Sequence, residues 1–197
     1  MQLDTPAYNR AAMTLHWLIA ALIVSMFFFG LYAHEQVEAL REGNAELQTV
    51  VALFNWHKTI GLLTLVLAIA RLALRLAYKA PPPSEQISRF ERILASATHV
   101  LFYFLIIGIP LSGWLIISTS ENPSYFFNNT GLQIPEIWGN DREFHEILEE
   151  VHEYAAFTIM GLLALHVAAA LKHHFVDGAD TLTRMIPGLK PKGRSKS

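Results

Sequence analysis

Four long apolar stretches constrain the fold of this chain more than any other feature of its sequence. They run approximately from residue 11 to 33, 51 to 77, 94 to 118 and 151 to 171. Each is long enough to cross the hydrocarbon core of a bilayer, which takes about 20 apolar residues in a helix. Lipid offers no partner for backbone polar groups, so single spans of this kind fold as helices. The stretches therefore predict an all-α integral membrane four-helix bundle.

The composition agrees with this interpretation. Of the 197 residues, 52% are hydrophobic and only 16% are charged, which is too apolar for a soluble domain of this length. The first stretch follows Arg10 as the apolar part of a secretory signal would, but it is too long and no small-residue cleavage site follows it. We expect it to remain as the first helix, so that residues 1–197 form one transmembrane domain.

The basic residues predict the orientation of the bundle. Arg41 is the only basic residue between 34 and 56, and Arg142 is the only one between 119 and 150. Lys58 is not counted here because it is assigned to the second helix. The other side, including a basic tail at 172–197, carries Arg10, Arg71, Arg75, Lys79, Arg89, Arg92, Lys172, Arg184, Lys190, Lys192, Arg194 and Lys196. The positive-inside rule then puts both termini in the cytoplasm. Basic residues dispersed in this way give no indication of a nucleic-acid partner.

Four histidines lie within or at the edge of apolar stretches, where ionisable side chains are expensive and normally functional. His152 and His166 are fourteen residues apart, so they share one helix face about 21 Å apart. The first helix begins inside and brings His16 to the level of His166, whereas the second begins outside and brings His57 to the level of His152. A single histidine could be a neutral group bonded between helices, but the four sort into an inner and an outer pair.

The pairs indicate a haem protein. Two facing imidazoles without carboxylates suit the axial positions of haem iron, whereas zinc usually takes a third or fourth protein ligand. There is no cysteine, which excludes disulfides, thiolate metal sites and covalently attached haem. Two axial imidazoles leave no open coordination position, which favours electron transfer. Small residues four positions after each histidine would admit a flat ligand, although they also suit close helix packing; they are Ala20, Gly61, Ala156 and Ala170.

Basic side chains near the two levels are candidates for binding haem propionates. Arg71 lies fourteen residues after His57, on the same face and at the level of the inner pair. The remaining candidates are Arg10 and Arg75 at the inner level and Lys58 at the outer level. For Arg75, a side chain that extends to the membrane surface is an equally good interpretation.

Three further histidines are open to more than one interpretation. His99 lies about one turn inside the third helix, and we expect it beside the ligands or against a quinone rather than as a ligand. His173 follows His166 by seven residues, where a quinone would need a proton donor or acceptor. At the outer surface, His145, Glu149 and His152 have the i, i+4, i+7 spacing of a metal site, an alternative that would remove His152 from the haem.

These residues occur in segments that are together similar to the bacterial cytochrome b561 family. The segments are LHWLIA, NWHKTIGLLTLVLAIARLALR, THVLFYFLIIGIPLSGWLI and EVHEYAAFTIMGLLALHVAAALKHHF. The resemblance implies a bacterial inner-membrane protein with two b haems, one held by His16 and His166 and the other by His57 and His152. It also implies ubiquinone as a redox partner, with His173 at the quinone site. For the superoxide oxidase type it implies superoxide as the periplasmic donor.

We therefore expect an oxidoreductase of the superoxide:ubiquinone type in which His173, Arg71 and His99 serve the reaction. Glutamates in segments 35–46 and 141–150 would repel an anionic donor, so another small molecule or a protein is the alternative reductant. A cytochrome b subunit that anchors another redox enzyme is the second functional class, and it would need a broad docking surface. A transporter is disfavoured because no helix is visibly broken at a polar site in mid-membrane.

Overall fold

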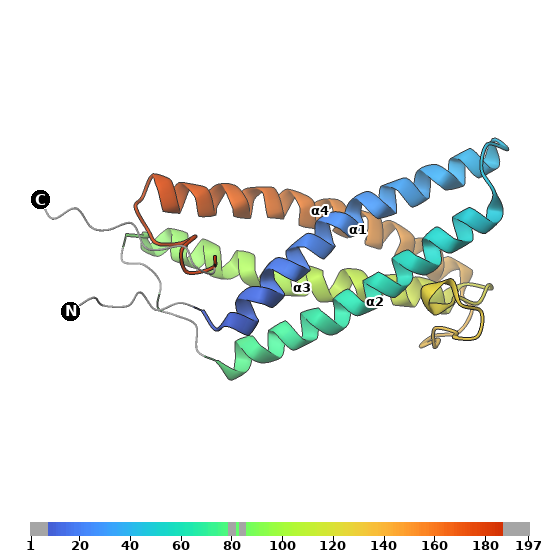
Figure 1. Cartoon of the computed structure of the whole chain (residues 1–197), viewed down its shortest axis with the longest axis horizontal. Coiled ribbons are helices and arrows are strands. Elements are labelled where there is room, and N and C mark those ends of the chain that lie inside the picture. The colour runs from blue at the N-terminus through green and yellow to red at the C-terminus, as the bar shows by residue number, and fades with distance from the viewer. Residues whose placement is uncertain (1–7, 79–81, 83–85, 187–197) are drawn as a thin grey trace, which may run out of the picture.

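The computed structural model describes residues 8–78, 82 and 86–186. It contains four long helices, α1 (Arg10–Arg41), α2 (Leu47–Ala77), α3 (Arg89–Thr119) and α4 (Arg142–Phe175), with a short turn η1 (Phe126–Asn128) before α4. All four are long and apolar enough to cross a membrane, and no β-strand occurs among the described residues. The predicted all-α bundle of four long apolar helices is thus confirmed (Figure 1).

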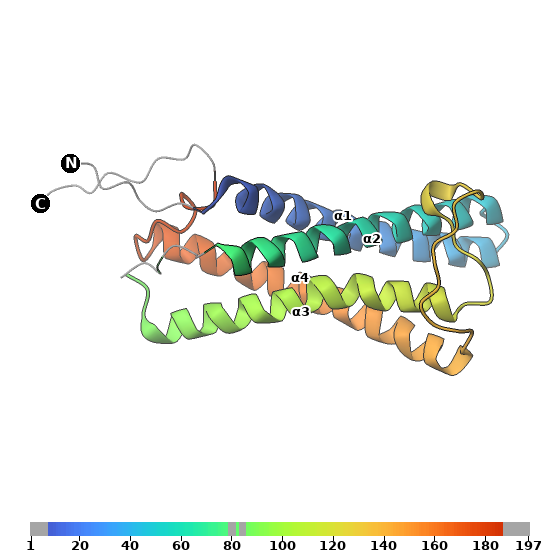
Figure 2. The ribbon, with the colours of Figure 1, turned by 90° about the horizontal axis from the view of Figure 1, so that it is seen from below.

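The helices alternate in direction, so α1 begins and α4 ends at the same end of the bundle (Figures 1 and 2). We call this the terminal end and the opposite one the loop end. Helix α2 packs against α1 and α3, and α3 packs against α4. The backbones of α1 and α4, and of α2 and α4, approach one another much less. Helix α4 therefore has a face that no neighbouring backbone covers closely.

The helices are longer than the predicted spans. Helix α1 continues to Arg41 instead of ending near 33, and α4 runs from Arg142 to Phe175 instead of from 151 to 171. The added segments at 34–41 and 142–150 are rich in Glu, which favours helix whether or not lipid surrounds it. The side chain of Asp141 accepts a hydrogen bond from Phe144 N at the start of α4, as a helix cap does. Apolar length therefore predicts the part of each helix that can lie in lipid, and not where the helix ends.

An apolar core lies halfway along the bundle. It is formed by Ala68 of α2, Leu105 and Ile106 of α3, and Ile159 of α4. Ile159 is seven residues from both His152 and His166, which is about 10 Å along the helix in each direction. The core therefore separates the loop end from the terminal end.

At the loop end, α2 holds the connection between α3 and α4. Asn55 accepts a hydrogen bond from Tyr125 N at 3.2 Å and donates one to Asn128 Oδ1 at 3.0 Å, while Thr59 Oγ1 accepts from Phe127 N at 2.9 Å. Asn55 is 4% exposed, so its polar groups depend on these partners. Phe127 and Asn128 both have positive φ, which the tether to α2 helps to maintain.

At the terminal end, the described part of the predicted tail is not free. Ala179 is buried, and Trp17 Nε1 donates to Met185 O at 2.8 Å, which brings the segment after α4 onto the start of α1. Arg184 donates to Pro82 O at 2.7 Å. Several basic residues assigned to this side lie outside the described residues: Lys79, Lys190, Lys192, Arg194 and Lys196.

Candidate functional site

The structure brings the four membrane histidines together in the two expected pairs. His16 of α1 and His166 of α4 form the terminal pair, with ring centres 6.4 Å apart and ring planes at 70°. His57 of α2 and His152 of α4 form the loop pair, again with ring centres 6.4 Å apart and planes at 69°. In both pairs the rings meet across helices whose backbones do not pack closely.

The spacing within each pair fits an atom held between two imidazoles. An imidazole nitrogen lies about 1 Å from its ring centre, given ring bonds of about 1.35 Å. It binds a metal at about 2 Å, so two axial imidazoles have centres about 6 Å apart. A direct hydrogen bond between the rings would draw them closer. The pairs thus have the separation that axial ligation of one metal requires.

The ring nitrogens of the loop pair are differently occupied. His152 Nδ1 lies 3.0 Å from Ile109 O and 3.0 Å from Ser112 Oγ. Because the Nδ1 hydrogen is donated to this carbonyl, the Nε2 of the same ring keeps its lone pair for a metal. His57 Nδ1 is buried without a hydrogen-bond partner. An unpartnered nitrogen of this kind is uncommon in a folded protein, and its burial beside His152 fits a ring that takes part in a metal site.

Two glycines leave room for the loop-pair rings. A Cβ atom on Gly30 of α1 would lie 3.3 Å from His57 Cε1, and one on Gly113 of α3 would lie 3.2 Å from His152 Cε1. Both distances are shorter than ordinary contacts. Gly61, the glycine selected from the sequence, would instead place a Cβ 3.9 Å from Met26, so its role toward haem stays a prediction. The sequence analysis did not assign Gly30 and Gly113 to the haem site, because each faces a histidine on another helix. The signal that could have identified them is their depth, which is level with the loop pair.

The terminal pair has a third histidine beside it. The His99 ring centre is 5.6 Å from that of His166 with planes at 87°, and Phe102 contacts the same ring at 5.2 Å. His99 Nδ1 donates to Ala95 O at 2.6 Å, which fixes the ring and leaves its Nε2 uncommitted. His99 therefore lies next to the pair, as expected.

The candidate basic residues differ in position. Arg71 donates to Ala12 O at 2.6 Å, which puts its guanidinium one helical turn from His16. Lys58 donates to Ser124 Oγ at 2.7 Å in the α3–α4 connection. Arg10 and Arg75 are exposed at the ends of their helices, and neither forms a hydrogen bond or ion pair within the described part of the chain. Arg71 is thus the best placed of the four toward the terminal pair.

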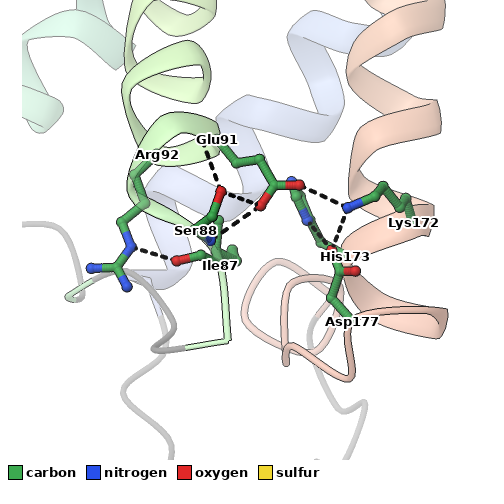
Figure 3. A network of polar contacts seen from close by, with 7 residues as sticks. All are labelled: Ile87, Ser88, Glu91, Arg92, Lys172, His173 and Asp177. Atoms are coloured by element: carbon green, nitrogen blue, oxygen red, sulfur yellow. Dashed lines mark hydrogen bonds and ion pairs between the residues drawn. The ribbon is translucent and has the colours of Figure 1, made fainter.

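His173 lies in the last turn of α4 within a cluster of charged groups (Figure 3). Its Nδ1 is 2.7 Å from Asp177 Oδ2. Lys172 Nζ contacts the same carboxylate at 2.8 Å and Glu91 of α3 at 2.7 Å. The cluster connects the end of α4 to the beginning of α3 beside the terminal pair.

The alternative metal site at the loop end is not assembled within the described residues. His145 Nε2 is 3.3 Å from Glu149 Oε1, and its Nδ1 is 3.0 Å from Thr119 Oγ1. His152, in contrast, uses its Nδ1 toward α3. The one described group of three close ligand atoms is formed by Glu91, His173 and Asp177 at the terminal end, within 4.8 Å of one another.

The sequence of this four-helix bundle matches a known family. The sequence model of the family described as prokaryotic cytochrome b561 covers residues 7–188 of this chain. The chain belongs to the prokaryotic cytochrome b561 family. It is therefore a multi-pass protein of the bacterial inner membrane that binds haem b and transfers electrons. The recognition made from the sequence is confirmed.

Curated relatives are similar over almost the whole length. Cytochrome b561 homolog 2 of Escherichia coli (strain K12) is 28% identical over 191 residues, which cover 93% of each chain. The protein named "Probable superoxide oxidase CybB" of Yersinia pestis is 27% identical over 180 residues, covering 91% of this chain and 96% of the relative. Cytochrome b562 of Cereibacter sphaeroides is 26% identical, with 92% and 96% covered. These cytochrome b561-type relatives support a redox role.

Proposed function

We propose that the chain is a di-haem cytochrome b that carries electrons from a periplasmic donor to ubiquinone. The observation that carries the proposal is the presence of two imidazole pairs of equal spacing at opposite ends of one bundle. A single pair would indicate one cofactor. Two pairs separated by an apolar core favour an electron path between the two faces of the membrane. The whole chain, residues 1–197, is then one di-haem domain.

The residues of each pair would act as axial ligands. His16 and His166 would hold one haem iron, and His57 and His152 the other. Haem b, when bound, supplies reversible one-electron chemistry. The chain's own residues would bind and orient the cofactors. The Arg71 guanidinium would pair with a propionate beside the terminal pair, with Arg10 and Arg75 as additional basic groups and Lys58 at the loop end.

The orientation follows from the loops. The terminal end carries most of the basic residues, so we assign it, with both termini, to the cytoplasm. The loop pair then lies near the periplasm and the terminal pair near the cytoplasm.

The donor side is the loop end and the acceptor side is the terminal end. The name of the Yersinia relative supports superoxide as the donor, and the reaction would convert two superoxide ions, one quinone and two protons into two dioxygen molecules and one quinol. Glu149 and its neighbours disfavour the approach of an anion, so a neutral small molecule or a protein is the other candidate reductant. At the terminal end, His173 would give a proton to the quinone, and His99 would contact it or the adjacent haem.

Two measurements test the proposal. A pyridine haemochrome assay on purified protein should return two b haems per chain, His16→Ala or His166→Ala should each remove one, and His57→Ala or His152→Ala the other. One haem per chain, or loss of the same haem in His16→Ala and His57→Ala, would refute the pairing.

Stopped-flow mixing with superoxide should reduce both haems quickly, and added ubiquinone should reoxidise them. Reduction by a quinol or a partner protein but not by superoxide would retain the electron path and change the donor. Absence of any reoxidation by quinone would contradict the acceptor assignment and favour a subunit serving another enzyme.

A further inference from the structure

The His173 imidazole is held by a carboxylate that lies outside the helix. His173 is 13% exposed and Asp177 19% exposed, and their 2.7 Å contact spans the end of α4. No described residue bonds to His173 Nε2, and this nitrogen is not among the enclosed atoms that lack a partner. One nitrogen of the ring is therefore fixed and the other is accessible.

Asp177 is kept ionised by its surroundings. Hydrogen bonds from Lys172 and then from His173 hold the pKa of the Asp177 carboxyl below its usual value. An ionised carboxylate is an acceptor only, so it selects the ring form that carries hydrogen on Nδ1. Glu91 in turn is fixed by Ser88, whose Oγ donates to Glu91 Oε2 at 2.7 Å. The chain of contacts thus runs from the α3 cap to the imidazole (Figure 3).

We infer that Asp177 is the positioning residue for proton delivery by His173 to the quinone, and that Lys172 and Glu91 hold Asp177 in place. The inference rests on the proposed quinone reduction at the terminal end. Asp177 orients the ring by accepting its Nδ1 hydrogen. From the imidazolium, which carries hydrogen on both nitrogens, Nε2 gives its proton to a quinone oxygen and the ring is left neutral with its Nδ1 hydrogen on the carboxylate. Nε2 then takes up a proton from the solvent, which restores the imidazolium.

With superoxide as the donor, the electrons and protons of quinone reduction balance. The quinone gains two electrons that arrive singly from two donor oxidations, and its two oxygens gain one proton each. One proton comes from His173 and the second from cytoplasmic water. No bond to a protein atom forms or breaks except N–H.

The same atoms do not favour a metal ion. The three ligand atoms of Glu91, His173 and Asp177 are close together, but the Lys172 ammonium contacts both carboxylates. A cation there already balances their charge, and a divalent ion would have to displace it. The arrangement fits a proton-handling pair better than a metal site.

The experiment measures haem reoxidation by a short-chain ubiquinone after a pulse of reductant, in haem-loaded protein. Asp177→Ala should keep both haems and their rate of reduction. The limiting rate of reoxidation should fall by about tenfold or more, while the quinone concentration that gives half the maximal rate stays unchanged. The solvent deuterium isotope effect on reoxidation should rise. Asp177→Glu should restore part of the rate. Glu91→Gln, which removes only the remote carboxylate, should cost less than Asp177→Ala.

A matched control exists at the other end of α4. Glu149 contacts His145 with the same four-residue spacing, so Glu149→Ala removes a histidine–carboxylate pair far from the terminal end and should leave quinone reoxidation unchanged. Wild-type reoxidation in Asp177→Ala, together with slow reoxidation in His173→Ala, would overturn this inference and keep the proposed function. Wild-type rates in both would reject the quinone site itself. If EDTA lowers the reoxidation rate of the wild-type protein, the cluster is a metal site and the inference is overturned. If Asp177→Ala loses haem, the Asp177 contact is structural and the inference is likewise overturned.

Discussion

His152 of the loop pair is fixed by hydrogen-bond partners that the terminal pair lacks. Ser112 Oγ donates to Ile109 O at 2.8 Å and lies 3.0 Å from His152 Nδ1. Neither His16 nor His166 forms a hydrogen bond through its ring within the described residues. Hydrogen bonds to the far nitrogen of a ligand histidine make it a stronger donor to the metal. If each pair holds a haem as proposed, the two haems are thus expected to differ in potential.

Ser112→Ala should raise the potential of the loop-pair haem, because His152 becomes a weaker donor and the oxidised iron is less stabilised. Haem content should stay at the wild-type value, since Ile109 O still accepts from the ring. Optical redox titration measures the change. Thr158→Val, which removes a hydroxyl bonded only to Tyr154 O on α4, is the control. Equal potentials in Ser112→Ala and wild type would show that Ser112 does not act on the ligand.

Gly113→Ala should disturb the loop pair alone. Its Cβ would press on His152 Cε1 at 3.2 Å, so the ring must move and haem occupancy at this pair should fall, with the terminal pair retained. The difference spectrum of each haem gives the readout. Gly108→Ala is the matched control on the same helix, since nothing lies within 4 Å of its added Cβ; replacing a helical glycine there should be neutral or stabilising by up to about 1 kcal/mol. Normal haem content in Gly113→Ala would count against this reading of the glycine.

At the scale of the elements, the sequence predicted the helices and the partner of each histidine well. Apolar length defined the spans, and the fourteen-residue spacing of His152 and His166 defined two levels on one helix. The direction of the first two helices then set which of their histidines lay at each level. The glycines that contact the histidine rings were not predicted, because a contact between two helices produces no repeating pattern in the sequence of either helix. His99 stayed open for a related reason, since depth in the membrane says nothing about the direction of a ring.

Three side chains of α2 bond to the α3–α4 connection, those of Asn55, Lys58 and Thr59. Asn55→Ala removes the contacts to Tyr125 and Asn128, each hydrogen bond contributing about 1 kcal/mol. Amide hydrogen exchange in residues 122–134 should therefore become about tenfold faster or more, while the helices exchange as in wild type. Gln48→Ala, an exposed position on the same helix, should leave this segment unchanged. Unaltered exchange in Asn55→Ala would mean that the connection is held by its own turns.

For the whole molecule, the open prediction is orientation. Alkaline phosphatase, which is active only outside the cytoplasm, should be active when fused after residue 44 or 140 and inactive when fused after residue 186. A green fluorescent protein fused at residue 186 should fluoresce. The opposite pattern would exchange the donor and acceptor ends, and would move His173 and Asp177 to the periplasmic face.

The apolar core around Ala68 and Ile159 has an electrical consequence. Its four buried residues carry no side chain that could hold a proton, so in the proposed di-haem path an electron would pass from the loop pair to the terminal pair with no compensating proton moving through them. Moving one charge through the full membrane field involves about 2.3 kcal/mol per 100 mV. In the proposed direction each turnover makes the cytoplasm more negative, and an existing voltage opposes the next one. A protein that consumes its donor in this way would also charge the membrane, and its rate would fall as the cell becomes more fully energised.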